Sequence, residues 1–129
     1  MLRLLASLAR ALEVTHAAGG LHRDVKGENV RVRRADAQPF LMDFGSGHYV
    51  GAATLTWQPF PPGTPAYRPP EAWRYVLRSS KPPAVAYAPG PADDLFALGV
   101  TAYRLVTGKY PPSAHPEEGD AWLWRPKAL

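Results

Sequence analysis

The most informative segment of the chain reads His22-Arg23-Asp24-Val25-Lys26-Gly27-Glu28-Asn29. We expect it to form a loop, because it is polar and irregular and lies between a predicted helix and a predicted strand. A carboxylate, an ammonium group and an amide oxygen fall within these eight residues. Asp24 could accept a hydroxyl proton, Lys26 could approach a transferring phosphate, and Asn29 could ligate magnesium.

The flanking segments predict a helix before this loop and a hairpin after it. Leu5, Leu8 and Leu12 share one helical face within residues 2–17, and Gly19-Gly20 can end that helix. Residues 30–33 alternate as a strand, residues 34–39 turn, and residues 40–42 read as a short buried strand.

The far end of this hairpin carries a second polar motif, Asp43-Phe44-Gly45. Because a hairpin folds back on itself, we expect Asp43 to lie near the first loop. Oxygen ligands from Asn29 and Asp43 suit Mg²⁺ that bridges phosphate oxygens. The other histidines, His16, His48 and His115, are isolated in sequence, and we expect ordinary solvated or packed side chains.

Proline is concentrated in the middle of the chain, with ten of the fifteen prolines between Pro59 and Pro91. Residues 43–70 show neither a helical nor a strand period, which predicts a long ordered loop. Pro70 can open a short helix that runs to about Leu77, and residues 79–91 form a second irregular stretch.

Residues 94–107 predict a helix that Asp93 or Asp94 could cap and that Gly108 follows. Between Leu95 and Val106 its clearly polar residues are Thr101 and Arg104. A helix that is apolar on nearly every face should be buried on nearly every face. Since the chain offers few other elements to cover it, we expect the 129 residues to be part of a larger domain.

Charge and cysteine content limit the classes of partner and compartment. The formal net charge is +4, yet the densest basic run, Arg31, Arg33 and Arg34, alternates with valines and lacks aromatic neighbours. This pattern is typical of a half-buried strand with a charged outer face, so we expect no nucleic-acid partner. The absence of cysteine excludes disulfides, and Arg10 and Glu13 interrupt the apolar N-terminus. We therefore predict a cytoplasmic protein without a membrane segment.

Four motifs in order give the chain a resemblance to protein kinases. Residues 22–29 resemble the catalytic loop, Asp43-Phe44-Gly45 the magnesium motif, and residues 63–71 the end of the activation segment. Residues 94–100 are similar to the start of the central helix of the large lobe. Lys26 and Gly63-Thr64-Pro65 favour the serine/threonine class, and the style is similar to the bacterial eukaryotic-like type.

The resemblance implies an α+β, mainly α fold. Residues 1–129 would form part of a kinase large lobe, with a catalytic loop at 22–29 on a small hairpin, an activation segment at 43–71 and a central buried helix at about 94–107. The small lobe would be missing, because only 21 residues precede His22 and they contain no glycine loop. The chain alone should then have very low activity.

The resemblance also assigns roles to individual residues. Asp24 would be the catalytic base and Lys26 would steady the γ-phosphate of ATP, while Asn29 and Asp43 would hold Mg²⁺. His22 would be a packed structural residue, and Thr64 would bond to Asp24 and Lys26. Arg23 would grip a phosphorylated residue of the activation segment, either Thr54 or Thr56, with Ser46 and Tyr49 as further candidates; the alternative is that both threonines only solubilise the loop. Glu71 and Asp94 would be structural residues of the activation segment and central helix.

Several features depart from the family pattern. Pro69 replaces the usual alanine, residues 78–92 lengthen the connection into the central helix, and Arg125 is a poor substitute for the late arginine that pairs with Glu71. The expected partners are a protein substrate with Ser or Thr and the missing kinase segments or a partner protein. The alternatives are a non-catalytic kinase-like binding or regulatory module, or a gene fragment. Trp122 and Trp124 could anchor a peptide or form core contacts with further structure.

Overall fold

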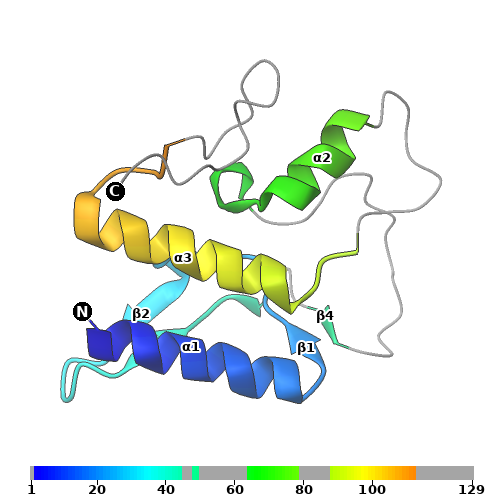
Figure 1. Ribbon diagram of the computed structural model, residues 1–129. Coiled ribbons are helices and arrows are strands. Elements are labelled where there is room, and N and C mark those ends of the chain that lie inside the picture. Colours follow the sequence, from blue (N-terminus) through cyan, green and yellow to red (C-terminus); the bar gives the residue numbers. More distant parts are fainter. Residues whose placement is uncertain (1, 45–47, 50–63, 79–87, 113–129) are drawn as a thin grey trace.

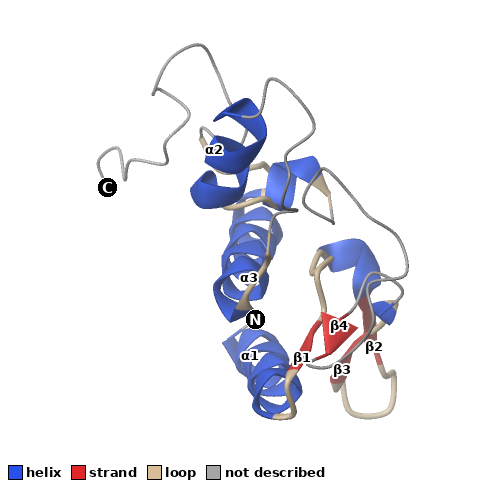
Figure 2. Cartoon of the chain, turned by 90° about the vertical axis from the view of Figure 1, so that its right-hand side faces the viewer, coloured by secondary structure: helices blue, strands red, loops and turns tan. Residues whose placement is uncertain are grey.

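The computed structural model describes residues 2–44, 48–49, 64–78 and 88–112. Figure 1 shows two long helices stacked one above the other, a third helix above them, and short strands beside them. Figure 2, turned by 90°, places the strands to one side of the helices. The elements in chain order are α1 (Leu2–Ala17), β1 (Gly20–Leu21), η1 (Gly27–Asn29), β2 (Val30–Val32), β3 (Pro39–Leu41), β4 (His48–Tyr49), η3 (Pro65–Tyr67), α2 (Pro70–Arg78) and α3 (Pro91–Thr107).

Helix α1 confirms the first predicted helix. Leu8 and Leu12 are fully buried, as the i, i+4 spacing of their side chains requires. Gly19 takes a left-handed φ of 83° just after the helix, and its amide N–H donates to the carbonyl of His16 at 2.9 Å. A residue with a Cβ would be strained at this φ, so glycine permits the turn into the loop.

The predicted hairpin is present, but its second strand begins one residue earlier than expected and is not the buried strand predicted, since Phe40 is 43% exposed. Strands β2 and β3 are antiparallel and pair Val30 with Leu41, Arg31 with Phe40 and Val32 with Pro39. The expectation of a half-buried strand is only partly met, because Val32 is 49% exposed while Val30 is partly covered. With only three residues, β2 is too short for its alternation to fix the burial of both valines.

A second two-stranded sheet corrects the prediction that residues 43–70 form a long ordered loop without helices or strands. Strand β4 pairs antiparallel with β1, with Gly20 opposite Tyr49 and Leu21 opposite His48. The 3₁₀ helix η3 also lies in this stretch. Elements of two or three residues have no detectable period, because they depend on tertiary pairing rather than on a local pattern.

Helix α3 begins three residues earlier than predicted. Gly90 is its N-cap residue, and the Asp93 carboxylate accepts a hydrogen bond from the Gly90 amide at 2.9 Å. The prediction that Asp93 or Asp94 caps the helix was therefore wrong, since both lie inside its first turn. Gly108 ends the helix in a left-handed conformation, as predicted.

The expectation that α3 is buried on nearly every face is also wrong for this chain. One face is covered, with Ala97, Val100 and Thr101 buried. The opposite side leaves Leu95 52% exposed and Val106 70% exposed. Nothing among the described segments covers these two side chains.

The core joins four segments that lie far apart in the sequence. Val25 of the loop at residues 22–29 is buried against residues of α1, η3 and α3. This packing fixes the polar loop at residues 22–29 on a hydrophobic base. The core consists of Leu12, Val25, Ala66, Tyr67, Ala97 and Val100. Across the described residues, no helix is both long and apolar enough to cross a membrane.

Candidate active site

The carboxylate of Asp24 is fixed by hydrogen bonds to both of its oxygens. The Thr64 hydroxyl donates to Asp24 Oδ1 at 2.9 Å, and the Asn29 amide donates to Asp24 Oδ2 at 3.3 Å. Lys26 Nζ donates to the same Thr64 hydroxyl at 2.9 Å and lies 3.7 Å from Asp24 Oδ2. The contact of Thr64 with both charged side chains is the one expected from the sequence. A carboxylate, an ammonium group and a hydroxyl group therefore form one small polar cluster that remains partly open to solvent.

Asn29 connects this cluster to the second motif. Its side-chain Nδ2 donates to the backbone carbonyl of Asp24 at 2.7 Å, which leaves the side-chain oxygen for another partner. Its own backbone carbonyl accepts a hydrogen bond from the Met42 amide at 2.7 Å. Because Met42 precedes Asp43, this bond brings the second carboxylate to the end of the hairpin where Asn29 lies.

The donor set fits magnesium better than a transition metal. Mg²⁺ prefers oxygen ligands and is usually held by one or two carboxylates together with substrate phosphates and water. The Asp43 carboxylate and the Asn29 amide oxygen are groups that could supply such ligands. Among the residues with described positions, no group of three or more His, Cys, Asp or Glu side chains could hold a metal ion.

The buried side chain of His22 connects the two motifs by hydrogen bonds to the backbone of each. Its side chain is fully buried, its Nδ1 accepts the Asp24 amide N–H at 3.1 Å, and its Nε2 donates to the Met42 carbonyl at 2.8 Å. These two partners require the neutral imidazole with its proton on Nε2. The ring also packs edge-on against Phe44, with ring centroids 4.4 Å apart. His22 is thus a packed structural residue, as expected.

Asp94 on α3 holds the backbone of the loop at residues 22–29. Its buried carboxylate accepts the amide N–H of His22 at 2.9 Å and that of Arg23 at 2.9 Å. His16 Nε2 of α1 donates to the same carboxylate at 2.8 Å. The interpretation of His16 as an isolated histidine was incomplete, because this residue links α1 to the aspartate that supports the site. Sequence alone offered no signal for a contact that spans 78 residues.

Backbone strain is found at both motifs. Arg23 has a φ of 74° and Asp43 a φ of 59°, and side chains with a Cβ rarely adopt such values. Strained residues of this kind concentrate at functional sites, where the surrounding contacts hold them.

Burial lowers the pKa of the Arg23 guanidinium, while the negative charge of Asp94 acts in the opposite direction. The Arg23 Nε atom is buried without a hydrogen-bond partner among the described residues.

One cation at the edge of the site, Arg104, was not predicted from the sequence to have a role there. Arg104 of α3 donates to the Tyr67 hydroxyl at 2.8 Å and lies 3.7 Å from Glu28 of the catalytic-loop stretch. Its guanidinium also stacks over the Tyr110 ring at 4.2 Å. The hydrogen bond to Tyr67 raises the pKa of Arg104, whereas burial raises the pKa of Tyr67. Arg104 therefore joins α3, η3 and the catalytic loop.

Comparison with known proteins identifies the family. A family model for the protein kinase domain matches residues 1–125, nearly the whole chain. The chain belongs to the protein kinase family. The resemblance to protein kinases drawn from the four motifs is thereby confirmed.

Curated relatives and a solved structure agree with this assignment. The serine/threonine-protein kinase PknA of Mycobacterium tuberculosis is 36% identical over 110 residues, which cover 85% of this chain and 23% of that protein. PknA of Nostoc is 32% identical over 133 residues (98% and 21%), and AfsK of Streptomyces griseus is 37% identical over 116 residues (89% and 13%). The chain thus spans less than a quarter of the length of these relatives.

The fold agreement is independent of these sequence matches. The kinase PK-1 of the Cydia pomonella granulovirus superposes with a TM-score of 0.61 at 29% identity, covering 84% of this chain and 35% of that one. The predicted α+β, mainly α, kinase-like fold is confirmed at this level.

The remaining predicted site residues of the kinase chain lie apart from the Asp24 cluster or outside the described residues. Glu71 is exposed in the first turn of α2, and no ion pair to it is found within the described segments. Thr54, Thr56 and Ser46 lie outside the described residues, as do Gly45 and Arg125, and the side chain of Tyr49 is not described.

Proposed function

We propose that this chain is the catalytic part of a serine/threonine protein kinase large lobe, which transfers the γ-phosphoryl group of ATP to Ser or Thr hydroxyls of a protein substrate. The observation that carries the proposal is the Asp24 carboxylate, held on both oxygens by Thr64 and Asn29. A base fixed in this way can orient a hydroxyl group without reorganising during the reaction.

Each residue of the cluster has a part in this transfer. Asp24 orients the acceptor hydroxyl and takes its proton as the hydroxyl oxygen bonds to the phosphorus and ADP departs. Lys26, next to Asp24 and Thr64, places a positive charge where the phosphoryl oxygens would lie. Asn29 and Asp43 would hold magnesium, which supplies neutralisation of the phosphate charge when bound.

We further propose a regulatory role for Arg23 with Thr54 or Thr56. Arg23 has a strained backbone φ of 74°, its amide N–H donates to Asp94, and its side chain is partly buried. A phosphate on either threonine would supply the charge-assisted hydrogen bonds that the buried Nε lacks among the described residues.

The test measures phosphate transfer by the longest natural product of the gene, in which residues 1–129 are accompanied by any further kinase segments, because residues 1–129 alone are expected to have very low activity. Radiolabelled ATP, Mg²⁺ and a pool of Ser, Thr and Tyr peptides are supplied, and the labelled residue is identified. We expect label on Ser or Thr, and a loss of roughly 10²- to 10⁴-fold in Asp24→Asn, because a positioned base contributes about that much to a rate. Asp36→Asn, on the exposed turn of the hairpin, is the matched control and should retain activity.

Magnesium binding gives a second readout. Asp43→Asn should weaken Mg²⁺-dependent binding of ATP, measured by titration calorimetry, while Asp24→Asn should leave that binding close to wild type. Full transfer activity in Asp24→Asn would disprove the proposed base, and label on Tyr alone would disprove the proposed substrate class.

The exposed apolar side of α3 favours one other function, a non-catalytic kinase-like binding module. Leu95 and Val106 would then contribute to a partner surface. Strong binding of a hydrophobic dye by a protein without transfer activity would support this second function. An active enzyme that binds no dye would exclude it.

A further inference from the structure

Arg104 is a fixed cation beside the proposed base. It donates to the Tyr67 hydroxyl at 2.8 Å, and its Nη1 atom lies 3.7 Å from the carboxylate of Glu28. Glu28 follows Asp24 by four residues in the same loop. Tyr67 follows Thr64 by three residues, and Thr64 donates to Asp24 at 2.9 Å. Arg104 therefore contacts both of the segments that position the proposed base.

The path along the chain places Arg104 within a few residues of a bound acceptor. Four residues of fully extended chain span at most about 14 Å. The 3₁₀ helix η1 shortens the path from Asp24 to Glu28, because it rises less per residue than an extended chain. An extended peptide advances about 3.3 Å per residue. A substrate whose hydroxyl lies at Asp24 can therefore bring a side chain from a nearby position to Arg104.

The guanidinium of Arg104 has donors left for such a side chain. A guanidinium group has five N–H donors, and among the described residues Arg104 makes one hydrogen bond, to Tyr67. The separation of 3.7 Å from Glu28 is too long for a hydrogen bond. The side chain of Arg104 is 32% exposed and stacks over the Tyr110 ring at 4.2 Å. The cation is thus held in place and still accessible to solvent.

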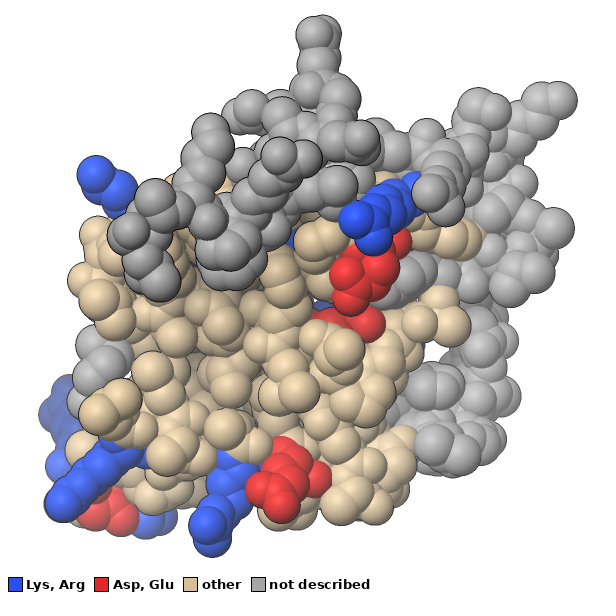
Figure 3. Space-filling model, in the orientation of Figure 1, with Lys and Arg blue, Asp and Glu red and all other residues tan. Residues whose placement is uncertain are grey.

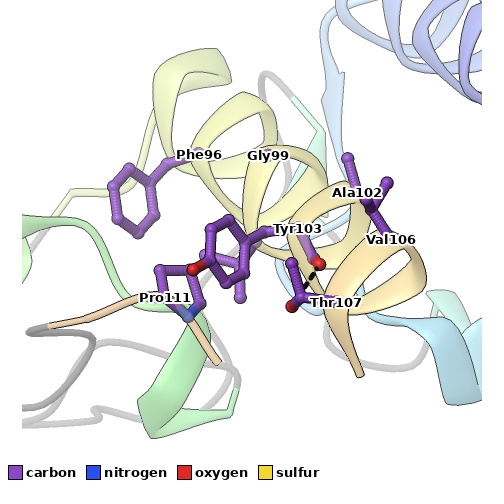
Figure 4. Close-up of a pocket in the computed structure, with 8 residues that line it drawn as sticks. Phe96, Gly99, Ala102, Tyr103, Val106, Thr107 and Pro111 are labelled. Atoms are coloured by element: carbon purple, nitrogen blue, oxygen red, sulfur yellow. Dashed lines mark hydrogen bonds between the residues drawn. The ribbon is translucent and has the colours of Figure 1, made fainter. Parts of the chain in front are cut away.

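The apolar cavity beside α3 adds no further charge. It has a volume of about 570 Å³, and Figure 4 shows Phe96, Tyr103 and Val106 among the residues that line it. None of the described residues that line the cavity carries a charge. On the face shown in Figure 3, charged side chains lie scattered near the edges, without a continuous area of one sign. Recognition of charge in a substrate near α3 would therefore depend on single side chains such as Arg104.

The contacts of Arg104 and Glu28 indicate which charge is favoured. A basic side chain that approached Glu28 would also meet the guanidinium 3.7 Å away, and like charges repel. The Glu28 side chain is 62% exposed and lies beyond hydrogen-bond distance of Arg104, whereas Arg104 is held by Tyr67 and Tyr110. A fixed guanidinium can form two parallel hydrogen bonds with a carboxylate, the arrangement in which arginine binds anions most strongly.

We propose that Arg104 selects protein substrates in which a carboxylate side chain lies within about four positions of the Ser or Thr acceptor. A basic side chain at the same position would be disfavoured. This inference rests on the proposed function, because it names the substrate class of the same site.

The test compares peptides that differ at one position. The reference peptide has a Ser acceptor with Ala at the four positions on either side, and Asp or Arg replaces one Ala at a time. The longest natural product of the gene is supplied with ATP and Mg²⁺, and kcat/KM is measured for each peptide. We expect Asp at one or two positions to raise kcat/KM by roughly 3- to 10-fold, and Arg at those positions to lower it, as for a partly exposed charge-assisted contact.

Variants of Arg104 show whether this side chain causes the preference. Arg104→Gln keeps a donor for Tyr67 and should abolish the preference, whereas Arg104→Glu should reverse it in favour of the Arg peptide. Arg104→Lys keeps the positive charge and should keep the direction of the preference. Arg10→Gln, at an exposed position of α1, is the matched control and should leave the preference unchanged. The readout is the ratio of kcat/KM between the Asp and Ala peptides, which a general loss of stability or activity does not change.

The outcomes separate this inference from the proposed function. Equal kcat/KM for the Asp, Ala and Arg peptides would disprove charge selection while leaving the phosphate transfer intact. A preference that persists unchanged in Arg104→Gln would show that another group causes it, and would also overturn the inference. Absence of transfer to every peptide would contradict the proposed function, and the inference with it.

Discussion

At the level of single residues, Thr64 connects the two charged side chains of the proposed reaction through one hydroxyl group. It accepts a hydrogen bond from Lys26 and donates one to Asp24, so it sets the distance between base and cation. Hydrogen bonds to charged groups contribute about 1.5–3 kcal/mol each. The geometry of the site therefore depends on a residue that takes no part in proton transfer.

We predict that Thr64→Val lowers kcat for phosphate transfer by roughly 10- to 100-fold, as the loss of one such bond implies. Thr64→Ser keeps the hydroxyl and should restore most of the activity. The measurement is kcat and KM for ATP in each variant, together with the melting temperature. A Val variant with wild-type kcat would show that Asp24 and Lys26 hold their positions without Thr64.

His16 does not contact the Asp24 cluster directly. It donates a hydrogen bond to the buried carboxylate of Asp94, which in turn holds the loop backbone. We predict that His16→Phe destabilises the protein by about 1–3 kcal/mol, because it leaves a buried carboxylate short of one hydrogen bond. The measurement is urea unfolding. His16→Gln can still donate and should cost less, and Glu13→Gln on the exposed side of α1 serves as the control. Equal stability of the Phe and Gln variants would mean that the bond does not contribute.

At the level of elements, the hairpin turn has its own local electrostatics. Arg33 donates two hydrogen bonds to Asp36, at 2.8 and 2.5 Å, and these bonds lower the pKa of the Asp36 carboxyl to about 2. Gln38 adds a backbone hydrogen bond in the same direction. The folded pKa lies below the ordinary value of 3.8, so the pair favours the folded state above about pH 4.

This stabilising contribution should be lost as the pH falls from about 4 to about 2, where Asp36 takes up its proton. We predict that Arg33→Gln moves the pKa of Asp36 back towards 3.8, observed by NMR titration of the carboxyl carbon. Arg34→Gln, which changes the neighbouring exposed arginine, should leave the pKa of Asp36 low. Since both partners are exposed, little change in stability is expected at neutral pH. An unchanged titration of Asp36 in Arg33→Gln would contradict this assignment.

Helix α3 shows how one element can serve two surfaces. Its first turn presents Asp94 to the catalytic-loop backbone, and its middle presents Ala97 and Val100 to the core. Its other side presents Val106 to the apolar cavity. The helix is apolar on nearly every face because two different faces can pack against other parts of the protein. The described residues cover only the face with Ala97 and Val100.

At the level of the whole molecule, the core links the catalytic loop to both long helices. Leu12 of α1 is fully buried in the cluster that contains Val25 of the loop and Val100 of α3. We predict that Leu12→Ala destabilises the protein by about 2–5 kcal/mol, the range found for leucine truncation in a core. Val14→Ala, on the exposed side of the same helix, should change the free energy of unfolding by less than about 0.5 kcal/mol. Chemical denaturation of both variants is the test, and equal effects would show that the packing of α1 is not selective.

The family could be predicted from four motifs, at residues 22–29, 43–45, 63–71 and 94–100, because each motif is a short local run of side chains that the sequence displays directly. The helices were also predicted, at 2–17, 70 to about 77 and 94–107, because periodic apolar residues and terminal glycines or prolines act within one element; only the start of α3, at Pro91, was missed by three residues. The pairing of β1 with β4 had no local signal, and neither did the bonds of Asp94 to His16 and to the loop backbone.

Sequence by itself therefore determined the protein kinase family, the candidate base and metal ligands, and the main helices. Only the tertiary structure decided which partners hold Asp24, which histidine supports Asp94, and which side of α3 stays uncovered. The physical reason is distance along the chain. Hydrogen bonds and packing between residues dozens of positions apart depend on how the helices, strands and loops are arranged in space. A local sequence pattern contains no information about that arrangement.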